Sequence, residues 1–528
     1  MTRFENLVLS EEERAAFLSR VRSVVSADDY RRIEAMARAL PELLAAAKDP
    51  AALRKLQHLL FGPKTEQKDR VCPPAAPATV RPPKGKRRGH GRIKAGDYTG
   101  ARWVQVPHPE LIAGQRCPDC GRGALRRQNP AKALRIEGSP PIAATGYRLE
   151  RLRCDTCGAV FTAPAPPEAC EKYAPNVAVM IALLRYGTGM PHHRLARLQQ
   201  SLGVPLPEST QWELIAPLGE LARPVFAELV AQAANAPLIH QDDTTMRILD
   251  LRRPGSAPAA ELDPKRKGTF TSNLLAEVQD HPIALYFTGW KHAGENLAEV
   301  LRQRAAQLAP PIQMCDALSR NTSPDADTVL AFCVVHARRE FITAAPNFPG
   351  ECRYVLDAIA EVYRFEAEAK ALRLPPEPRL AFHQTNSQPV MEGLKAWMQE
   401  KIEGRHVEPN SGLGQAIGYM LRHWEPLTLF LRKPGAPLDN NRSEQALKMA
   451  ILHRKNSLSY KTLGGARTGD LFMSLIHTCR LGHVNPFDYL LALATNPAAV
   501  RARPAAWLPW NYRAENPALG HDPPGPAL

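Results

Sequence analysis

Five short apolar runs and one amphipathic helix follow one another between residues 237 and 336, and their order constrains the fold more than any other feature. Apolar runs of this length predict strands, and the spacing of the apolar positions in 294–308 predicts a helix. The adjoining runs 269–280 and 281–290 predict a hairpin. The order strand, strand, strand, helix, strand, strand is typical of an α/β sheet. The other three strands are predicted at 237–244, directly before Asp316, and at 328–336.

Three acids occupy particular places in this order. Asp242 ends the first predicted strand, Asp316 ends the fourth, and Glu444 lies in the opening turns of a late helix whose cap is Asp439 or Asn440. In a ribonuclease-H-like sheet the first and fourth strands are neighbours, so their aspartates converge at one edge, and a helix packed across that edge adds the glutamate. Surface acids at strand ends are the alternative interpretation.

Such an acid trio has a definite chemistry. Three carboxylates a few ångströms apart cannot all stay ionised without a cation, and Mg²⁺ (or Mn²⁺) favours oxygen ligands. Two catalytic ions would support an in-line phosphoryl displacement, in which one activates the attacking oxygen and the other stabilises the leaving oxygen.

Two cysteine pairs predict a zinc site. CPDCG (Cys117 and Cys120) and CDTCG (Cys154 and Cys157) each place two residues between the cysteines and a glycine after them. A tight turn of this kind directs two thiolates at one tetrahedral Zn²⁺, and two such turns supply four ligands. Four thiolates leave no open position, so the predicted zinc is structural. A redox role and accidental pairing are the alternatives.

Several motifs of the chain resemble the insertion-sequence-66 family of bacterial transposases, and they run colinearly across nearly the whole sequence. The most specific is PLDNNRSEQALK at 437–448. The others are LLFGPKTEQ at 59–67, GHGR with the downstream VPHPEL, the cysteine pairs, LIHQDDT, CVVHARREF at 333–341, HRKN, and LPWNY at 508–512.

The resemblance implies a DDE transposase with a zinc-finger domain, and it assigns the catalytic, magnesium-binding trio to Asp242, Asp316 and Glu444. The family usually has Asp-Glu-Thr at the first acid, where this chain has Asp242-Asp243-Thr244. Asp243 is therefore an alternative ligand. The implied reaction cleaves the ends of an insertion sequence and transfers the strands into target DNA.

The charge of the chain agrees with a DNA partner. Lys and Arg number 68 against 53 Asp and Glu, a formal net charge of +15. Such an excess favours a polyanionic partner. The expected partners are terminal inverted repeats and target DNA, together with a homo-oligomer that pairs the ends and small accessory proteins of the same element. The predicted DNA-binding residues are Lys84, Lys86, Arg87, Arg88, Arg338, Arg339, Arg442, Lys448, Arg454, Lys455 and Lys461.

The predicted protein is a multidomain α/β chain with a ribonuclease-H-like core, a helical insertion, a zinc ribbon and N-terminal helices. The first region contains a helix with Leu53, Leu56 and Leu60 on one face, part of a hairpin or a dimerising helix. Residues 193–215 form either a helix-turn-helix or ordinary core packing. The predicted regions are N-terminal helices at 1–70, a basic Pro-rich linker or phosphate-contacting arm at 71–100, the zinc ribbon at 101–170, helices at 171–232, the first part of the core at 233–345, the insertion at 346–432, the second part of the core at 433–480, and a C-terminal segment at 481–528.

Two alternative functions follow from the same residues. One is a DNA-binding protein with a silent acid site, and the other is a ribonuclease-H-like nuclease that cuts without joining. No apolar run approaches the roughly 20 residues that a membrane-spanning helix requires, and the N-terminus lacks the apolar stretch of a secretory signal. The expected location is therefore the bacterial cytoplasm, in association with the nucleoid.

Overall fold

The computed structural model describes residues 11–22, 30, 34, 66, 68–72, 104–129, 131, 133, 135–136, 138–153, 155, 157, 159–252, 266 and 268–515. The chain divides into two compact units. One combines residues 1–73 with 146–528, and the other is 74–145.

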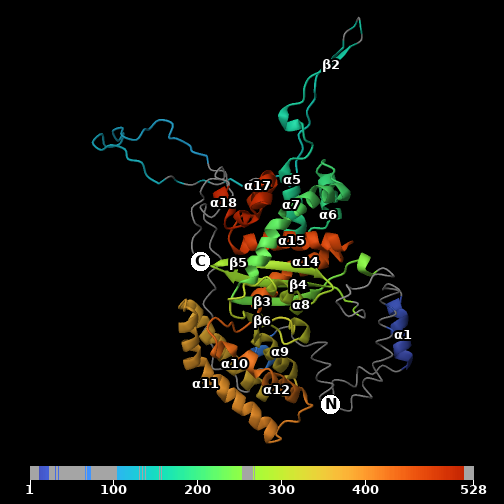
Figure 1. Ribbon diagram of the computed structural model, residues 1–528, viewed down its shortest axis with the longest axis vertical. Coiled ribbons are helices and arrows are strands. Elements are labelled where there is room, and N and C mark those ends of the chain that lie inside the picture. The colour runs from blue at the N-terminus through green and yellow to red at the C-terminus, as the bar shows by residue number, and fades with distance from the viewer. Residues whose placement is uncertain are drawn as a thin grey trace. The chain divides into compact units, whose positions relative to one another are not determined.

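A five-stranded mixed sheet lies at the centre of the larger unit. Its strand order is β5-β4-β3-β6-β7 (Figure 1). β3 pairs antiparallel with β4 and parallel with β6. The predicted adjacency of the first and fourth strands is thus confirmed. The strands are β3 (Leu238–Thr245), β4 (Phe270–Val278), β5 (His281–Gly289), β6 (Ile312–Cys315) and β7 (Val329–Phe332).

The predicted hairpin is β4 and β5. Val278 pairs with His281, so the connection is the two residues Gln279 and Asp280. Both have positive φ, 50° and 65°. Two successive residues of this kind form the turn whose twist matches that of an antiparallel pair, which explains how the hairpin closes without a glycine.

Helix α15 (Leu463–Leu481) covers the β5 edge of the sheet. Thr478 Oγ1 and Ser474 Oγ accept the backbone N–H groups of Ala284 and Tyr286, and Asp470 accepts that of Thr288. Four residues of helix rise about 6.0 Å, which is close to the roughly 6.7 Å that two strand residues span. Every fourth residue of α15 therefore lies opposite every second residue of β5. The donors of an edge strand are thereby satisfied inside the protein.

The last predicted strand is shorter than expected, and its end belongs to a helix. Strand β7 stops at Phe332, and α9 (Val334–Ala344) begins two residues later. His336, predicted to end the strand, lies instead in the first turn of α9. The helix begins there because extended Cys333 caps it (φ −71°, ψ 116°).

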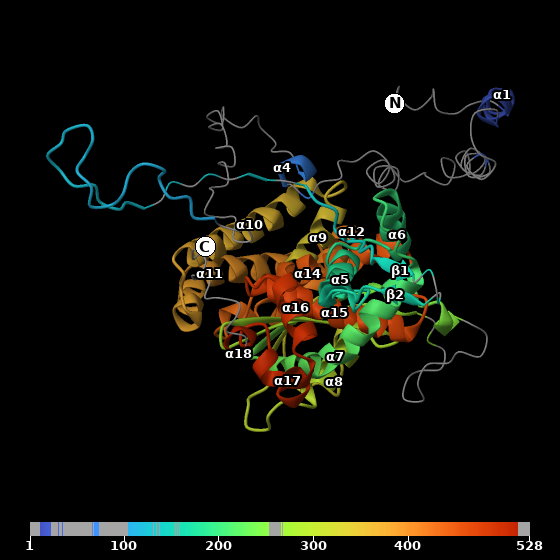
Figure 2. The same cartoon turned by 90° about the horizontal axis from the view of Figure 1, so that it is seen from above.

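A helical layer follows β7 in the sequence, and its core is continuous with that of β6, β7 and α9. In Figure 1 its helices gather beyond β6, and Figure 2 shows α10 and α11 side by side. The helices are α10 (Pro349–Ala371), α11 (Pro376–Glu403), α12 (Gly412–Arg422), α13 (Trp424–Leu427) and the 3₁₀ turn η7 (Leu429–Leu431).

The other helices of this unit complete the α/β arrangement. Among them, α6 and α7 are joined by residues 202–207, where the buried Gln211 side chain donates to the Leu206 carbonyl. The remaining elements are α1 (Glu11–Arg22), α4 (Lys68–Val71), η3 (Pro167–Ala169), α5 (Pro175–Ala182), the π-turn η4 (Leu183–Gly187), α6 (His192–Ser201), α7 (Glu208–Ala234), η5 (Asp250–Arg252), α8 (Ala293–Leu301), η6 (Ser319–Asn321), α14 (Asn441–Ser457), α16 (Pro486–Thr495), α17 (Pro497–Ala502), η8 (Pro504–Trp507) and α18 (Tyr512–Glu515).

Two predicted features of the N-terminal part lie outside the described residues: the helix carrying Leu53, Leu56 and Leu60, and the basic Pro-rich linker at 71–100 except for its first two residues. Among the helices of the described ranges, none combines the length and the apolarity needed to cross a membrane.

Candidate active site

Asp242 and Asp316 reach the same level of the sheet because β3 and β6 run in parallel. The register pairs His240 with Met314, and each aspartate lies two residues further along its strand direction. Side chains two residues apart lie on one face of a strand, so the two carboxylates belong to the same face. This is the convergence that the sequence predicts for the two aspartates.

The pKa of the Asp242 carboxyl depends on its burial and on the neighbouring acids. Burial raises the pKa of its carboxyl to about 7, although its Oδ1 accepts the Asp243 backbone N–H at 2.8 Å. The negative charges of Asp316, Asp243 and Glu444 raise this pKa as well. Mutual repulsion among partly buried carboxylates is the condition that a divalent cation relieves.

Asp243 points to the opposite face, as alternation along a strand requires. Its Oδ2 lies 2.9 Å from His292 Nδ1 and its Oδ1 lies 3.3 Å from Arg320 Nε. These partners surround a side chain that is only 1% exposed. The geometry therefore favours Asp242 over Asp243 as the acid that joins Asp316 and Glu444.

Asn440 fixes the start of α14, the helix that carries Glu444. Its side-chain Nδ2 donates to the Gln241 carbonyl at 2.8 Å, and its Oδ1 lies 3.1 Å from His240 Nδ1. Its backbone N–H donates to Cys333 Sγ at 3.3 Å. The helix start is thereby joined to β3 beside Asp242 and to the start of α9.

A second pair of polar side chains holds the first turn of α14 against β4. Ser443 Oγ donates to Asn273 Oδ1 at 3.0 Å, and Asn273 Nδ2 donates to the Ser443 carbonyl at 3.3 Å. Both side chains are fully buried. Asn273 pairs with Asp242 across β3 and β4, so the bonds place Glu444, the next residue of α14, near that aspartate. Asn273, Asn440 and Ser443 were not among the predicted site residues, although Asn440 and Ser443 belong to the PLDNNRSE motif.

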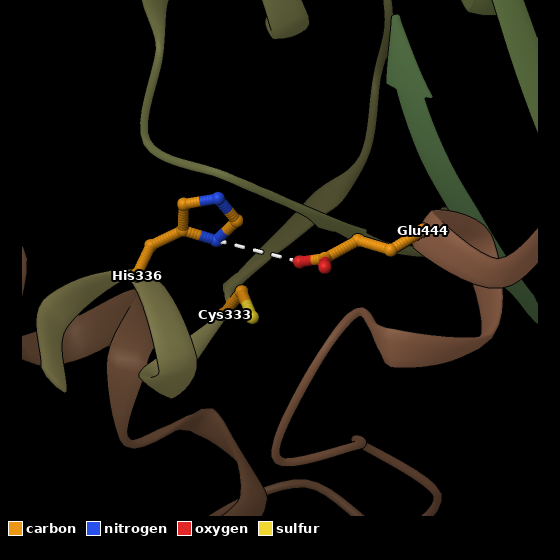
Figure 3. A group of neighbouring side chains, drawn as sticks. All are labelled: Cys333, His336 and Glu444. Carbon is orange, nitrogen blue, oxygen red and sulfur yellow. Dashed lines mark ion pairs between the residues drawn. The ribbon is translucent and has the colours of Figure 1, made fainter. Parts of the chain in front are cut away.

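Glu444 also lies beside His336 of α9 and Cys333, the residue that precedes this helix (Figure 3). The ligand atoms of Cys333, His336 and Glu444 lie within 4.8 Å of one another, a group that does not include the two aspartates. His336 Nδ1 and Glu444 Oε1 are 4.0 Å apart, and within the described part of the chain neither atom has a hydrogen-bond partner. Cys333 Sγ already accepts a backbone N–H, and burial raises the pKa of its thiol to about 11.

The carboxylate oxygens of this site are donors of the type that a magnesium or manganese ion binds. Glu444 offers a buried carboxylate oxygen without a partner among the described residues, and Asp242 shares its repulsive environment. Asp316 is oriented by the Leu318 backbone N–H and by the Asn321 side-chain amide, both donating to Oδ1. Carboxylate oxygens held in this way are the donor set that Mg²⁺ and Mn²⁺ prefer.

Arg338 and Arg339, predicted to contact DNA, follow His336 on α9 and meet an acid from far away in the sequence. Arg338 Nη1 lies 3.2 Å from Glu66 Oε2, and Arg339 Nε lies 3.0 Å from Glu66 Oε1. Arg339 Nη2 also lies 3.7 Å from Glu444 Oε2. Glu66 was not predicted as a site residue, since only its place within LLFGPKTEQ marks it.

The other predicted DNA contacts in the described residues lie on or after α14. Arg442 Nη2 lies 3.3 Å from Glu277 Oε2. Arg454 donates to Thr244 Oγ1 and to the Thr245 carbonyl, so it holds α14 to the end of β3. The side chains of Lys448, Lys455 and Lys461 are exposed. Lys84, Lys86, Arg87 and Arg88 lie outside the described residues.

The two predicted zinc-binding cysteine pairs belong to different units of the chain. In the unit 74–145, Cys117 N–H donates to the Gly123 carbonyl, and the Gly121 N–H donates to the Cys117 carbonyl. Gly121 has a φ of +63°, as a tight turn requires. The backbone N–H groups of Gly123 and Arg122 lower the pKa of the Cys120 thiol.

The second cysteine pair lies in the larger unit. Strands β1 (Arg151–Arg153) and β2 (Val160–Thr162) pair antiparallel on either side of it. Cys157 is described and Cys154 lies outside the described residues. The four-cysteine set therefore stays a prediction.

Comparison with known proteins identifies the class. The family model described as "Transposase IS66 family" matches residues 172–468. This range includes β3 to β7, α14 and all three acids, and it covers more than half of the chain. A transposase is an enzyme that modifies nucleic acid, so its partner is DNA. The chain belongs to the IS66 family of transposases.

Curated relatives match over a similar length. The uncharacterized protein y4jD of Sinorhizobium fredii is 26% identical over 459 residues, which cover 82% of this chain and 86% of the relative. The uncharacterized protein y4hP of the same organism is 26% identical over 451 residues, 79% of this chain and 78% of the relative. A third, y4qI, is 25% identical over 382 residues, 67% and 66% of the two chains.

Proposed function

We propose that the chain cleaves the ends of an insertion sequence and transfers them into target DNA, with Asp242, Asp316 and Glu444 as the catalytic acids of a ribonuclease-H-like core. The observation that carries this proposal is the common level of Asp242 and Asp316 on parallel neighbouring strands. Family membership and the repulsion between Asp242 and Glu444 support it.

The three acids would hold two Mg²⁺ or Mn²⁺ ions. When bound, such ions lower the charge on the reacting phosphate, activate the attacking oxygen and stabilise the leaving oxygen. The chain's own residues give the acids their geometry: Asn440 and Ser443 fix the turn that carries Glu444, and Asn321 orients Asp316. Preorganised ligands of this kind lower the cost of assembling the reactive arrangement.

Two displacements at phosphorus make up the proposed reaction. In the first, water bonds to the phosphorus at the element end, and the 3′ oxygen leaves as a hydroxyl. In the second, the oxygen of that hydroxyl bonds to a target phosphorus and gives its proton to solvent. The target's own 3′ oxygen leaves and takes up a proton from solvent to become a hydroxyl. The number of phosphodiester bonds is conserved in the second step, so strand transfer needs no external energy source.

The remaining residues are proposed to hold DNA. Arg338 and Arg339 on α9, and Arg442 with the exposed lysines of α14, carry charges that suit the phosphate backbone. A structural zinc held by Cys117, Cys120, Cys154 and Cys157 would order a ribbon that binds the terminal repeats. Two ends must be joined in one reaction, so we expect a homo-oligomer, with accessory proteins of the element as further partners.

One assay tests the proposal. Purified protein is incubated with labelled DNA that carries the ends of its own element, with Mg²⁺ or Mn²⁺, alongside the Glu444→Gln variant. We expect nicked ends and joined products from the wild type and neither from the variant. Nicks without joined products would indicate a nuclease. Binding without nicks would indicate a silent site and would contradict the proposal.

A further inference from the structure

Glu66 places a carboxylate across the two guanidinium groups of Arg338 and Arg339. The contacts are Arg338 Nη1 to Oε2 at 3.2 Å and Arg339 Nε to Oε1 at 3.0 Å. Arg338 also donates to the Glu66 backbone carbonyl. A carboxylate and a phosphate offer the same paired oxygens to arginine, so the site that receives Glu66 has the chemistry of a phosphodiester-binding site.

This arginine pair lies directly beside the third acid. Arg339 Nη2 is 3.7 Å from Glu444 Oε2, and Arg339 Nη1 is 3.3 Å from His336 Nε2. A phosphate held by Arg338 and Arg339 would therefore be adjacent to the residue proposed to bind metal. In the absence of DNA, the negative charge of Glu66 cancels part of the positive charge available there.

The segment that carries Glu66 is fixed only a few residues further on. Cys72 is 1% exposed within the core of the helical layer, and its carbonyl accepts Arg353 Nη1 at 2.8 Å. Asp69 lies 3.1 Å from the same Arg353 nitrogen, and Lys68 forms an ion pair with Asp357. These contacts hold the chain at α4 whether or not Glu66 stays in place.

Glu66 itself is easily displaced. Its side chain is 48% exposed, and ion pairs at such exposure are weak because solvent screens them. A DNA phosphate attracted by several cations at once can compete with contacts of this strength. The tether at α4 then keeps Glu66 near enough to return when the DNA leaves.

We propose that Arg338 and Arg339 form a phosphodiester-binding site that Glu66 occupies as an internal competitor while no DNA is bound. This inference rests on the proposed function, because it takes the DNA backbone as the ligand beside Glu444. DNA can then bind these arginines only when a phosphate replaces the Glu66 carboxylate. This competition weakens the binding of DNA that makes few other contacts with the protein.

The test measures the affinity of the full-length protein for a labelled 30-base-pair duplex by fluorescence anisotropy, at low salt and with EDTA. Glu66→Gln is compared with Glu361→Gln. Glu361 is also half-exposed, at 49%, pairs with Arg364 on α10, and gives the same change in net charge. We expect Glu66→Gln to bind about three- to tenfold more tightly, which lies within the range expected from losing one or two such pairs. Glu361→Gln should bind nearly as the wild type does.

Two further variants make the result specific. Glu66→Ala should show the same gain, and thermal unfolding followed by circular dichroism confirms that both variants fold. In a protein that carries Arg338→Gln and Arg339→Gln, Glu66→Gln should not increase the affinity for DNA, because the arginines for which Glu66 and phosphate compete are absent. Equal affinities of the Glu66 and Glu361 variants, or weaker binding by the Glu66 variants, would overturn the inference and leave Glu66 a structural brace.

Failure of this inference and failure of the proposed function are distinguishable. The anisotropy measurement needs no cleavage, so a chain that never nicks DNA can still show the gain in Glu66→Gln. A chain that nicks and joins DNA, yet shows no difference between the two glutamine variants, would retain the proposed function and lose only the internal competitor.

Discussion

Asn440 and Asn441 are neighbours in the PLDNNRSE motif. Replacing each by alanine in turn shows whether the buried contacts of Asn440 matter, because both variants lose the same kind of side chain. The Asn440 side chain is 1% exposed and bonds His240 Nδ1 and the Gln241 carbonyl, whereas Asn441 is exposed. Asn440→Ala leaves two buried polar groups without their partner. Each such group costs about 1–3 kcal/mol, so we expect the free energy of unfolding to fall by about 2–6 kcal/mol.

Urea unfolding followed by circular dichroism measures this loss, and Asn441→Ala should stay within about 0.5 kcal/mol of the wild type. Because Asn440 also sets the position of Glu444, the Asn440 variant should lose nicking activity even under conditions where it remains folded. Equal stability and equal activity of the two alanine variants would refute the claim that Asn440 joins α14 to β3.

Three further outcomes follow from the structure. Burial raises the folded pKa of Asp242 to about 7, above its usual value near 4. In EDTA, the stabilising contribution of this carboxyl is therefore present below pH 4 and disappears as the pH rises through 7. A thermal unfolding series across this pH range should show a smaller decline in stability for Asp242→Asn, and an identical decline would contradict the burial of Asp242. Asp470→Ala removes the acceptor for Thr288 N and Oγ1 at the β5 edge. Urea unfolding should show that the free energy of unfolding falls by about 2–4 kcal/mol. A change below about 0.5 kcal/mol would exclude a stabilising role for these two hydrogen bonds. Metal analysis should find one zinc ion per chain, which is lost in Cys117→Ser and Cys157→Ser and kept in Cys170→Ser. A wild-type protein without zinc would contradict the predicted zinc ribbon.

The sheet was predictable because each strand is a short apolar run that becomes buried. The runs at 237–244 and before Asp316 correspond to β3 and β6, and these strands are neighbours, as expected for the first and fourth strands of a ribonuclease-H-like sheet. The end of β7 was not predictable from its apolar residues, since the apolar run continues into α9 without a break. The capping conformation of Cys333 sets that boundary.

The choice between Asp242 and Asp243 required the register of the sheet. Adjacent residues of a strand point to opposite faces, and a one-residue slip would exchange their roles. The pairing of His240 with Met314 determines which acid shares a face with Asp316.

Contacts between distant segments were the least predictable part of the site. Glu66 is separated from Arg338 by 272 residues, and no sequence pattern around either residue predicts their contact. Arg454 was predicted to contact DNA as one of several basic residues on α14, and the structure adds a contact within the protein, because its Nη1 donates to Thr244 Oγ1 and to the Thr245 carbonyl. Charge in a sequence indicates the kind of partner, whereas the tertiary structure selects which cations remain available.

Anomalous diffraction from crystals of the protein grown with Mn²⁺ tests the central claim most directly. We expect manganese peaks about 2.2 Å from carboxylate oxygens of Asp242, Asp316 and Glu444, with Asp243 still bound to His292 and Arg320. Peaks absent from this edge of the sheet, or manganese held by Asp243 instead, would contradict the assignment of the three acids to one metal-binding site.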